Sequence, residues 1–188
     1  MESKQQGRIL ISSRLELQIL EGSHSTALLE NANDLAIADT MISVPHPFLE
    51  DHAREWADRA ASDYQSGSGY HWGIFNRISK GFAGYVTLRA IDKEHSQAEL
   101  SFWISRKDWG KGYAKEACAT VLEFAFEMLK INRIYAHHMV RNPASGKVLL
   151  HLGFLHEGLL RQRVIKWGKR EDVVLQALLR EDWEQKNH

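Results

Sequence analysis

The sequence predicts an α+β fold built on one mixed β-sheet, and three observations predict this class. Segments in which apolar and polar residues alternate lie between segments with apolar residues at three- and four-residue spacing. Three consecutive strand-like segments occupy the middle of the chain and precede a strongly helical one. The 188 residues suit a single hydrophobic core, and no repeat, low-complexity tract or linker divides them. We therefore expect one domain over residues 1–188, with a short N-terminal arm over residues 1–12.

The elements are expected in the order β, α, α, β, β, β, α, β, α, β, β. Strands are expected where apolar residues alternate or run together, at residues 14–20, 70–77, 82–92, 95–104, 133–140, 154–166 and 171–179. Helices are expected where apolar residues recur with helical spacing, at residues 23–33 and onward to 41, 50–64, 114–129 and 144–152. Pro45 and Pro47 interrupt the helical pattern, because a proline disfavours helix in the residue before it.

Composition and charge exclude several classes of protein. With 24 basic and 24 acidic residues the formal net charge is zero, so a general nucleic-acid-binding charge is absent and we expect no nucleic-acid partner. No apolar run reaches membrane length and the N-terminal residues lack a signal-peptide core, which favours a cytoplasmic protein without a membrane partner. The one cysteine, Cys118, lies on an apolar helical stripe and is expected to be buried. His46, His52 and His71 lack metal-ligand spacing with acidic or Cys partners, so we expect no metal.

The stretch from Ala98 to Ala125 contains a candidate phosphate-binding turn. A strand runs through a short polar segment into Trp109-Gly110-Lys111-Gly112-Tyr113-Ala114, where a helix starts. Amides of a first helical turn have no partner within the helix and carry the positive end of its dipole, and glycines let a phosphate approach them. A glycine used only for tight packing is the other explanation. A dinucleotide fingerprint would need a third glycine at Lys115, and a P-loop would need Gly-Lys-Ser/Thr at Gly110-Lys111-Gly112.

A second segment, one strand further along the chain, makes the interpretation of the first segment more specific. It begins with Asn142, a good helix N-cap, and ends at Gly153, a good terminator. Together the two segments resemble the GNAT superfamily of acyl-CoA-dependent N-acetyltransferases. The superfamily's cofactor signature, Arg/Gln-x-x-Gly-x-Gly/Ala, corresponds to Trp109-x-x-Gly112-x-Ala114, with tryptophan in place of Arg or Gln. Its next signature, Asn-x-x-Ser/Ala followed by an apolar helix and Gly-Phe, corresponds to Asn142, Ser145 and Gly153-Phe154.

Three further segments are similar to the RimJ/RimL branch, which acetyltransferases of ribosomal-protein N-termini typify: the strand 99–104, the turn 109–114 and the hairpin 168–172. The resemblance implies a GNAT-like acyl-CoA N-acyltransferase fold, a central mixed and mostly antiparallel twisted sheet flanked by helices. Its fourth and fifth strands, here 95–104 and 133–140, splay apart and hold the pantetheine arm of acetyl-CoA. The cosubstrate contacts that it implies are Phe102, Trp103, Ile104, Trp109, Gly110, Lys111, Gly112, Tyr113, Ala114, Asn142 and Ser145. Charge for the phosphates is expected from Lys111, Lys115, Arg141 and Lys147.

Acetyl transfer to an amine requires a neutral nitrogen, a donor for the oxyanion and a proton for the departing thiolate. An α-amine has a pKa of about 7.7–8.0 and a lysine amine one of about 10.4. At neutral pH, deprotonating the first costs about 1 kcal/mol and deprotonating the second about 4–5 kcal/mol. An α-amine acceptor therefore needs only a weak base or a water path to solvent.

Three residues are candidates for this chemistry, each with a structural alternative. Glu99 is the first candidate base; otherwise it pairs with a neighbouring strand or the first helix. His137 stands where some relatives place a glutamate base; otherwise it is a half-buried structural histidine. Because neighbouring side chains of a strand point to opposite faces, at most one of His137 and His138 is expected in the cleft. Ser145 is the candidate leaving-group contact, as in RimJ/RimL-like proteins, because Leu149 replaces the tyrosine acid of other members. Its alternative is a capping hydroxyl.

The leading hypothesis is an acetyl-CoA-dependent N-acetyltransferase that acts on a protein N-terminal α-amine, of ribosomal-protein type, by direct attack in a ternary complex. A second hypothesis is acetylation of a small amine such as a polyamine, amino acid or amino-antibiotic. The acidic residues of the helix expected at 50–64 keep this hypothesis open. A third is a weakly catalytic CoA-binding regulatory module. The chain is expected to be a monomer or a homodimer, and the hairpin around Gly168 offers an edge for the latter.

Overall fold

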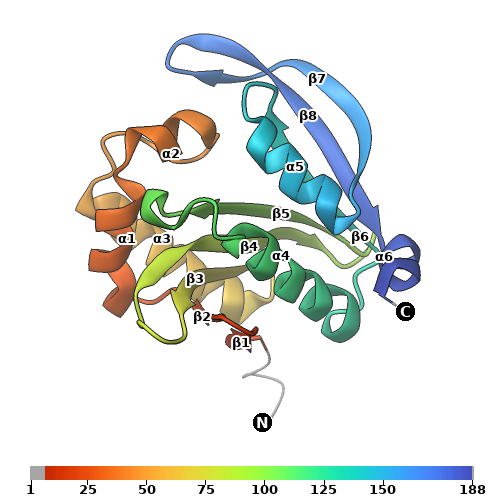
Figure 1. The fold of residues 1–188 in the computed structure, drawn as a ribbon, viewed down its shortest axis with the longest axis horizontal. Helices are drawn as coiled ribbons and strands as arrows, with labels where there is room; N and C mark the ends of the chain where they lie inside the picture. Colours follow the sequence, from red (N-terminus) through yellow and green to blue (C-terminus); the bar gives the residue numbers. More distant parts are fainter. Residues whose placement is uncertain (1–6, 188) are drawn as a thin grey trace.

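The computed structural model describes residues 7–187, which form one eight-stranded sheet with helices on both faces (Figure 1). The strands are β1 (Ile9–Ile11), β2 (Leu15–Ile19), β3 (Tyr70–Asn76), β4 (Phe82–Asp92), β5 (Gln97–Ile104), β6 (Arg133–Met139), β7 (Leu155–Lys166) and β8 (Lys169–Leu179). The α-helices are α1 (Ser25–Ala32), α2 (Leu35–Thr40), α3 (Glu50–Ser66), α4 (Tyr113–Glu123), α5 (Pro143–Leu152) and α6 (Arg180–Asn187). Short turns of other helix types are η2 (Gly22–His24), η3 (Arg106–Asp108) and η4 (Phe124–Met128).

The sheet has the order β1-β2-β3-β4-β5-β6-β8-β7, and its neighbours pair antiparallel except β5 and β6. The parallel β5–β6 pairing joins only residues 97–99 to residues 133–135, after which the two strands diverge. This confirms the predicted α+β class, the mixed and mostly antiparallel sheet, and the splay between the strands predicted at 95–104 and 133–140.

The two faces of β5 belong to two different hydrophobic clusters, because side chains of a strand alternate between faces. Leu100, Phe102 and Ile104 pack into the larger cluster, which includes the buried residues of α4 and α5. Trp103 packs with residues of α1, α2 and α3 on the opposite face. Figure 1 shows α4 in front of the sheet and α3 behind it. The gap between β5 and β6 therefore connects two differently covered sides of the molecule.

Some elements differ from the expected ones. β1 lies within the stretch expected to be an arm, whose residues 1–6 lie outside the described part of the chain. The helix expected to run to residue 129 ends in the π-helical turn η4, and α6 was not expected at all. α6 is polar, and it is anchored by tertiary contacts: Trp183 packs on Phe126, and the Arg180 guanidinium donates to the carbonyls of Phe126 and Ile131.

Cys118 is fully buried on α4, as predicted, and burial raises the pKa of its thiol. None of the helices within residues 7–187 combines the length and the hydropathy of a membrane span.

α5 lies unusually close to β6 at Gly146. A Cβ atom on Gly146 would come within 2.7 Å of Nε2 of His138, which is buried and whose Nδ1 donates to the Met139 carbonyl at 3.0 Å. The imidazole is held in place, so the helix can approach the strand here only because residue 146 has no side chain.

We expect Gly146→Ala to lower the free energy of unfolding by about 1–2 kcal/mol, because the clash outweighs the gain of roughly 1 kcal/mol that alanine brings to a helix. Urea denaturation measures the change. Gly158→Ala is the matched control, since a Cβ atom there meets nothing within 4 Å. A Gly146→Ala protein as stable as the control would contradict this account of the α5–β6 contact.

Candidate active site

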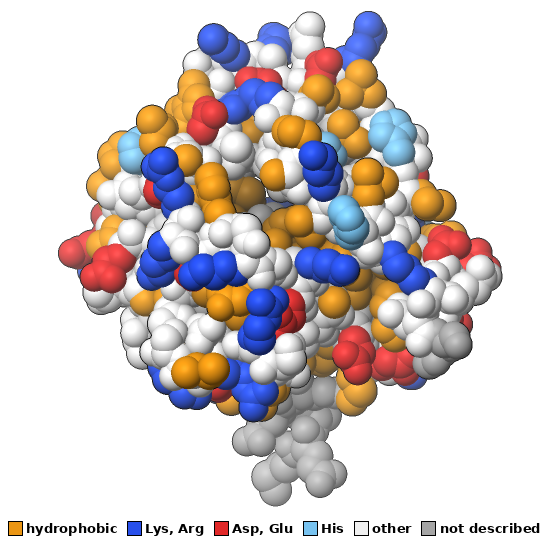
Figure 2. Space-filling view, viewed as in Figure 1, with side chains coloured by type: hydrophobic (Ala, Val, Ile, Leu, Met, Phe, Trp, Pro, Cys, Tyr) orange, Lys and Arg blue, Asp and Glu red, His pale blue; other side chains and the backbone are white. Residues whose placement is uncertain are grey.

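A cleft of about 640 Å³ opens between the end of β5, the start of α4 and the start of α5. Figure 2 shows this face of the molecule hollowed near its centre, with hydrophobic side chains around the hollow and Lys and Arg side chains close by. Of the predicted cosubstrate contacts, the cleft brings together Phe102, Trp103, Ile104, Trp109, Gly110, Gly112, Tyr113, Ala114, Asn142 and Ser145. Lys111 does not line it, and its ammonium group binds the Asp108 carboxylate at 2.7 Å.

The floor of the cleft at its outer end is the turn 109–114. Gly110 and Gly112 have φ angles of +77° and +78°, a backbone region that favours glycine. α4 begins at Tyr113, and its first helical hydrogen bond runs from the Glu116 amide to the Gly112 carbonyl at 3.1 Å. In the described part of the chain, the amides of residues 113–115 therefore have no backbone acceptor. Such a helix start suits a diphosphate.

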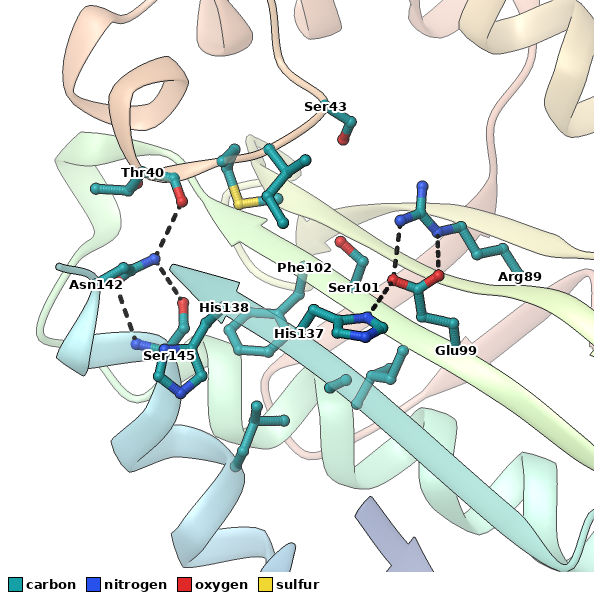
Figure 3. A pocket seen from close by; sticks show the side chains of 15 residues that line it. Thr40, Ser43, Arg89, Glu99, Ser101, Phe102, His137, His138, Asn142 and Ser145 are labelled. Atoms are coloured by element: carbon teal, nitrogen blue, oxygen red, sulfur yellow. Dashed lines mark hydrogen bonds and ion pairs between the residues drawn. The ribbon is translucent and has the colours of Figure 1, made fainter. Parts of the chain in front are cut away.

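A smaller cavity of about 30 Å³, room for a water-sized group, adjoins the cleft where β5 and β6 diverge (Figure 3). The residues that line both spaces are Thr40, Met41, Phe102, Asn142 and Ser145. The inner cavity is also bordered by residues 42–43, which follow α2, and by the side chains of Arg89, Glu99 and His137. The two spaces meet at Ser145, so a group held in the cleft and a group held in the cavity can react there.

The hydroxyl of Ser145 is held by Asn142, the N-cap of α5. The Asn142 amide nitrogen donates to Ser145 Oγ at 3.0 Å and to the Thr40 carbonyl at 3.3 Å. The Asn142 amide oxygen accepts from the Ser145 backbone at 3.3 Å. Asn142 is therefore the cap of α5, and the alternative role of Ser145, a capping hydroxyl, is not needed. The Ser145 hydroxyl accepts from Asn142, so its own proton remains available to another acceptor. Leu149, where other superfamily members carry a tyrosine, is buried at the wall of the inner cavity.

Glu99 is paired with Arg89, its direct cross-strand neighbour on β4. The guanidinium donates to both carboxylate oxygens, at 2.9 and 3.1 Å, and His137 Nδ1 lies 3.3 Å from Oε1. Burial raises the pKa of Glu99, but hydrogen bonds from His137 and Arg89 and their charges lower it to about 2. That is roughly 6 units below an α-amine, so accepting its proton would cost about 8 kcal/mol. The structural pairing that the sequence left open is therefore present, and Glu99 is a poor final proton acceptor.

His137 and His138 both line the inner cavity, which corrects the expectation that at most one of them enters it. The two side chains do point to opposite faces of β6, but the gap beside this strand opens to both faces, so the cavity wraps around its edge. His138 is packed beneath Gly146 of α5. His137 is half-buried, and Glu99 is its one hydrogen-bond partner within residues 7–187.

Two of the four expected phosphate cations, Lys115 and Arg141, line the cleft, whereas Lys111 and Lys147 do not. Arg141 is already engaged: its guanidinium binds Asp39 at 2.6 Å and Glu171 at 3.0 Å, joining α2 to β8. Lys115 is exposed at the start of α4. Within residues 7–187, no three His, Cys, Asp or Glu side chains come together in a group that could hold a metal ion.

The tip of the β7–β8 hairpin closes against the segment around α2. Trp167 Nε1 donates to the Asp39 carboxylate at 2.8 Å, and the buried Lys166 ammonium donates to the Val44 carbonyl at 2.7 Å. Burial lowers the pKa of Lys166. These contacts, which the sequence did not indicate, hold the residues after α2 against the inner cavity.

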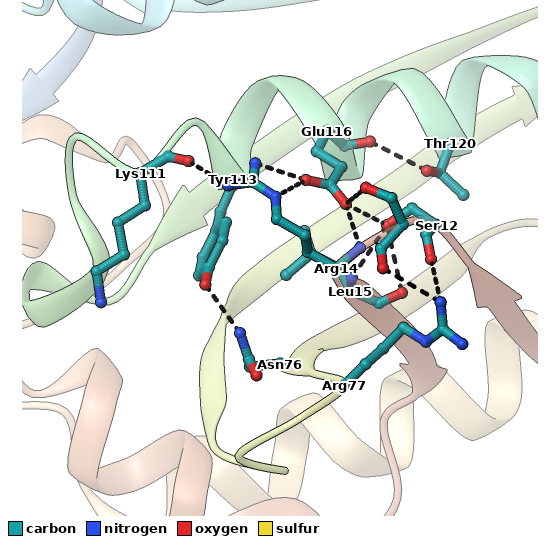
Figure 4. Close-up of polar contacts among 10 residues, drawn as sticks. Ser12, Arg14, Leu15, Asn76, Arg77, Lys111, Tyr113, Glu116 and Thr120 are labelled. Carbon is teal, nitrogen blue, oxygen red and sulfur yellow. Dashed lines mark hydrogen bonds and ion pairs between the residues drawn. The ribbon is translucent and has the colours of Figure 1, made fainter.

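The candidate phosphate-binding turn is supported by Arg14, which lies just before β2 (Figure 4). Its guanidinium binds the Glu116 carboxylate at 2.7 Å, donates to the Lys111 carbonyl at 3.0 Å and lies 4.9 Å from the centre of the Tyr113 ring. The Asn76 amide in turn donates to the Tyr113 hydroxyl at 2.8 Å. Sequence reasoning missed this network, because its partners are far apart in the chain.

We expect Arg14→Gln to weaken coenzyme A binding roughly tenfold, or about 1.4 kcal/mol, because the turn loses a charged contact to α4 and a donor to Lys111. Isothermal titration calorimetry measures the affinity. Arg8→Gln is the control: Arg8 also pairs with a glutamate, Glu21, but contacts no residue of the turn. Equal affinities of the two variants would contradict a supporting role for Arg14.

Comparison with known proteins agrees with this geometry. The family described as the acetyltransferase (GNAT) domain matches residues 14–155. The [ribosomal protein uS5]-alanine N-acetyltransferase of Escherichia coli is 31% identical over 121 residues, which are 64% of this chain and 62% of that protein. The spermidine N(1)-acetyltransferase of Vibrio cholerae is 30% identical over 106 residues, 56% of this chain and 61% of that protein. The chain thus matches about three fifths of the length of these two relatives.

Solved structures share the whole fold. The structure of RimL, a ribosomal L7/L12 α-N-protein acetyltransferase in complex with coenzyme A, superposes with a TM-score of 0.85 at 22% identity, covering 91% of this chain and 97% of that one. The family match spans the β5–α4 turn, the splayed strands and α5, which together build the cleft. The chain belongs to the GNAT acetyltransferase family and is an N-acetyltransferase.

Proposed function

We propose that the protein transfers the acetyl group of acetyl-CoA, the cosubstrate of its family, to the N-terminal α-amine of a protein, of ribosomal-protein type. The observation that carries the proposal is the charge balance of the inner cavity. Among the described residues that line it, Glu99 is the one carboxylate, and Arg89 neutralises it. An acceptor that brings a single amine fits such a cavity better than a polycation, which needs several free carboxylates.

The acidic side chains of α3, which kept a small polyamine open as acceptor, do not change this balance. Glu50, Asp51, Glu55 and Asp58 are exposed to solvent, and none of them lines the cleft or the inner cavity. Among the relatives, one acetylates a ribosomal-protein alanine and another acetylates spermidine, so similarity supports either acceptor. The electrostatics of the cavity favour the first.

Acetyl-CoA fits the cleft with its diphosphate at the amides of residues 113–115 and its pantetheine arm along β5. Beyond Glu99, the backbone groups of β5 that face β6 have no strand partner within residues 7–187, so the arm can pair with them as an added strand would. This direction brings the thioester to Ser145, at the junction of the two spaces. The unpaired β5 amides are also the donors that we assign to the developing oxyanion.

The reaction requires two proton transfers from the acceptor. We assign the first proton of the α-ammonium to His137 rather than to Glu99, because Arg89 occupies both carboxylate oxygens of Glu99, whereas Nε2 of His137 has no hydrogen-bond partner among the described residues. The neutral nitrogen then attacks the thioester carbonyl, and a C–N bond forms. The C–S bond breaks as the nitrogen loses its second proton to solvent, and the thiolate takes a proton from the Ser145 hydroxyl, which water restores. The products are an acetylated amine and the free thiol of coenzyme A.

We expect Ser145→Ala to lower kcat roughly ten- to a hundredfold with little change in coenzyme A affinity, because the thiolate loses a donor that acts only in the transition state. Thiol release gives the rate and calorimetry gives the affinity. Ser66→Ala, at the exposed end of α3, is the control. Unchanged turnover in Ser145→Ala and His137→Gln would instead indicate a CoA-binding module without this chemistry.

We expect peptides with a free N-terminal alanine or serine to be acetylated with a kcat/KM roughly a hundredfold higher than spermidine, because the cavity offers no free carboxylate to a second ammonium group. The same peptides with a blocked N-terminus and an internal lysine serve as controls and should be inert, since the lysine amine costs about 3 kcal/mol more to deprotonate. Preferential acetylation of spermidine would refute the proposed acceptor.

A further inference from the structure

Arg89 is a charged residue at the wall of the inner cavity to which the proposed reaction gives no task. It lies directly opposite Glu99 in the β4–β5 register, and its guanidinium contacts both carboxylate oxygens, Nη2 to Oε1 at 2.9 Å and Nε to Oε2 at 3.1 Å. Oε1 also accepts from His137 Nδ1 at 3.3 Å. Arg89, Glu99 and His137 thus form a row across three neighbouring strands, which we call the Arg–Glu–His row (Figure 3).

The row determines which nitrogen of His137 carries the proton. An ionised carboxylate can only accept hydrogen bonds, so the His137 nitrogen that faces Glu99 must be the donor. The neutral imidazole then has its proton on Nδ1 and a lone pair on Nε2, for which no described residue is a hydrogen-bond partner. A protonated Glu99 could instead donate to Nδ1, and the imidazole would then present an N–H at Nε2 and could not take up a proton there.

The ionised state of Glu99 depends on Arg89. The Glu99 side chain is 15% exposed, and burial by itself disfavours a carboxylate. The Arg89 guanidinium opposes this effect of burial, because its two charge-assisted hydrogen bonds stabilise the ionised carboxylate. The same two bonds fix the plane of the carboxylate toward His137. Other ionisable groups that interact with Arg89 are Tyr85 on its own strand, Tyr135 on β6 and His71 on β3. None of these three hydrogen bonds to Glu99.

We propose that Arg89 is a positioning residue: it holds Glu99 ionised and aligned, so that Glu99 keeps the proton of His137 on Nδ1 and leaves Nε2 free to receive the proton of the acceptor amine. The inference rests on the proposed function for the identity of the acceptor, but the state of the row does not depend on which amine binds. Replacing the aspartate that orients the histidine of a Ser-His-Asp triad lowers kcat by about 10⁴. Arg89 acts one residue further away and its side chain is 39% exposed, so a smaller effect is expected.

The first measurement is the tautomer of His137 without any substrate, by nitrogen NMR of imidazole-labelled protein, with His137→Gln assigning the signal. We expect the Nδ1–H tautomer in the wild-type protein and a mixture of tautomers in Arg89→Gln. The wild-type protein with its proton on Nε2, or an Arg89→Gln protein with an unchanged tautomer, would overturn the proposal. Since no acceptor is present, failure of the peptide assay would count against the proposed function alone.

The second measurement is the pH profile of kcat/KM, with whichever amine the wild-type enzyme acetylates. Arg89→Gln should lose roughly ten- to a hundredfold in kcat, and its acid limb should move to higher pH, because removing a positive charge favours proton binding to the row. Arg89→Lys, which keeps the charge but not the fork, should leave the limb in place and recover part of the rate. An unmoved limb in Arg89→Gln would contradict the proposal, since a merely structural defect lowers the rate at all pH values alike.

Two controls separate positioning from folding. Arg133→Gln removes an equivalent arginine–glutamate pair, Arg133 with Glu157 between β6 and β7, which borders neither the cleft nor the inner cavity. It should keep the wild-type rate and profile. Coenzyme A affinity and the thermal midpoint are measured for all variants, and Arg89 does not line the cleft, so its loss should leave that affinity unchanged. A parallel loss of coenzyme A binding in Arg89→Gln and Arg89→Lys would overturn the assignment.

Discussion

The divergence of β5 and β6 is the constraint on which the rest of the structure depends. The two strands share a parallel ladder over three residues and then separate, which leaves backbone groups of β5 without a strand partner, among the described residues, in the middle of a sheet. Buried backbone groups are costly unless they are paired, so such a gap persists only if something else fills it. Here the gap also joins the two faces of the sheet, and this is why Ser145, on the α5 side, and Glu99 and His137, on the α3 side, border one continuous space.

The helix ends around the gap are held by contacts that reach across the molecule. Asn142 caps α5 and at the same time binds the last residue of α2 through the Thr40 carbonyl. Arg141, next to it, ties Asp39 of α2 to Glu171 of β8. The end of one short helix thus becomes a wall of the inner cavity. These contacts explain how six residues of α2, too few to be stable as an isolated helix, keep a defined position.

The features that local sequence determines were predictable. The strands between residues 14 and 179, the glycine turn before α4 and the Asn142 cap each depend on residues within one element, and the structure has them all. Contacts between elements were not predictable. Arg89 opposes Glu99 only through the exact register of β4 and β5, and Arg14 meets Glu116 across 102 residues of sequence. The low pKa of Glu99 follows from the hydrogen bonds of His137 and Arg89, which outweigh its burial, so the sequence could name the carboxylate but not its role.

Trp109 shows why a departure from the family signature leaves the proposed phosphate-binding turn intact. A diphosphate at a helix start is bound by backbone amides, which do not depend on the side chain at this position. The Trp109 indole instead donates to the Ile104 carbonyl at 2.7 Å, which fastens the turn to the end of β5. The strand end at which we propose that the thioester lies therefore also fixes the amides that we propose for the phosphates. We infer that the distance between the two ends of the bound cosubstrate is set by the end of β5, to which Trp109 fastens the turn, while Arg14 fastens the same turn to α4.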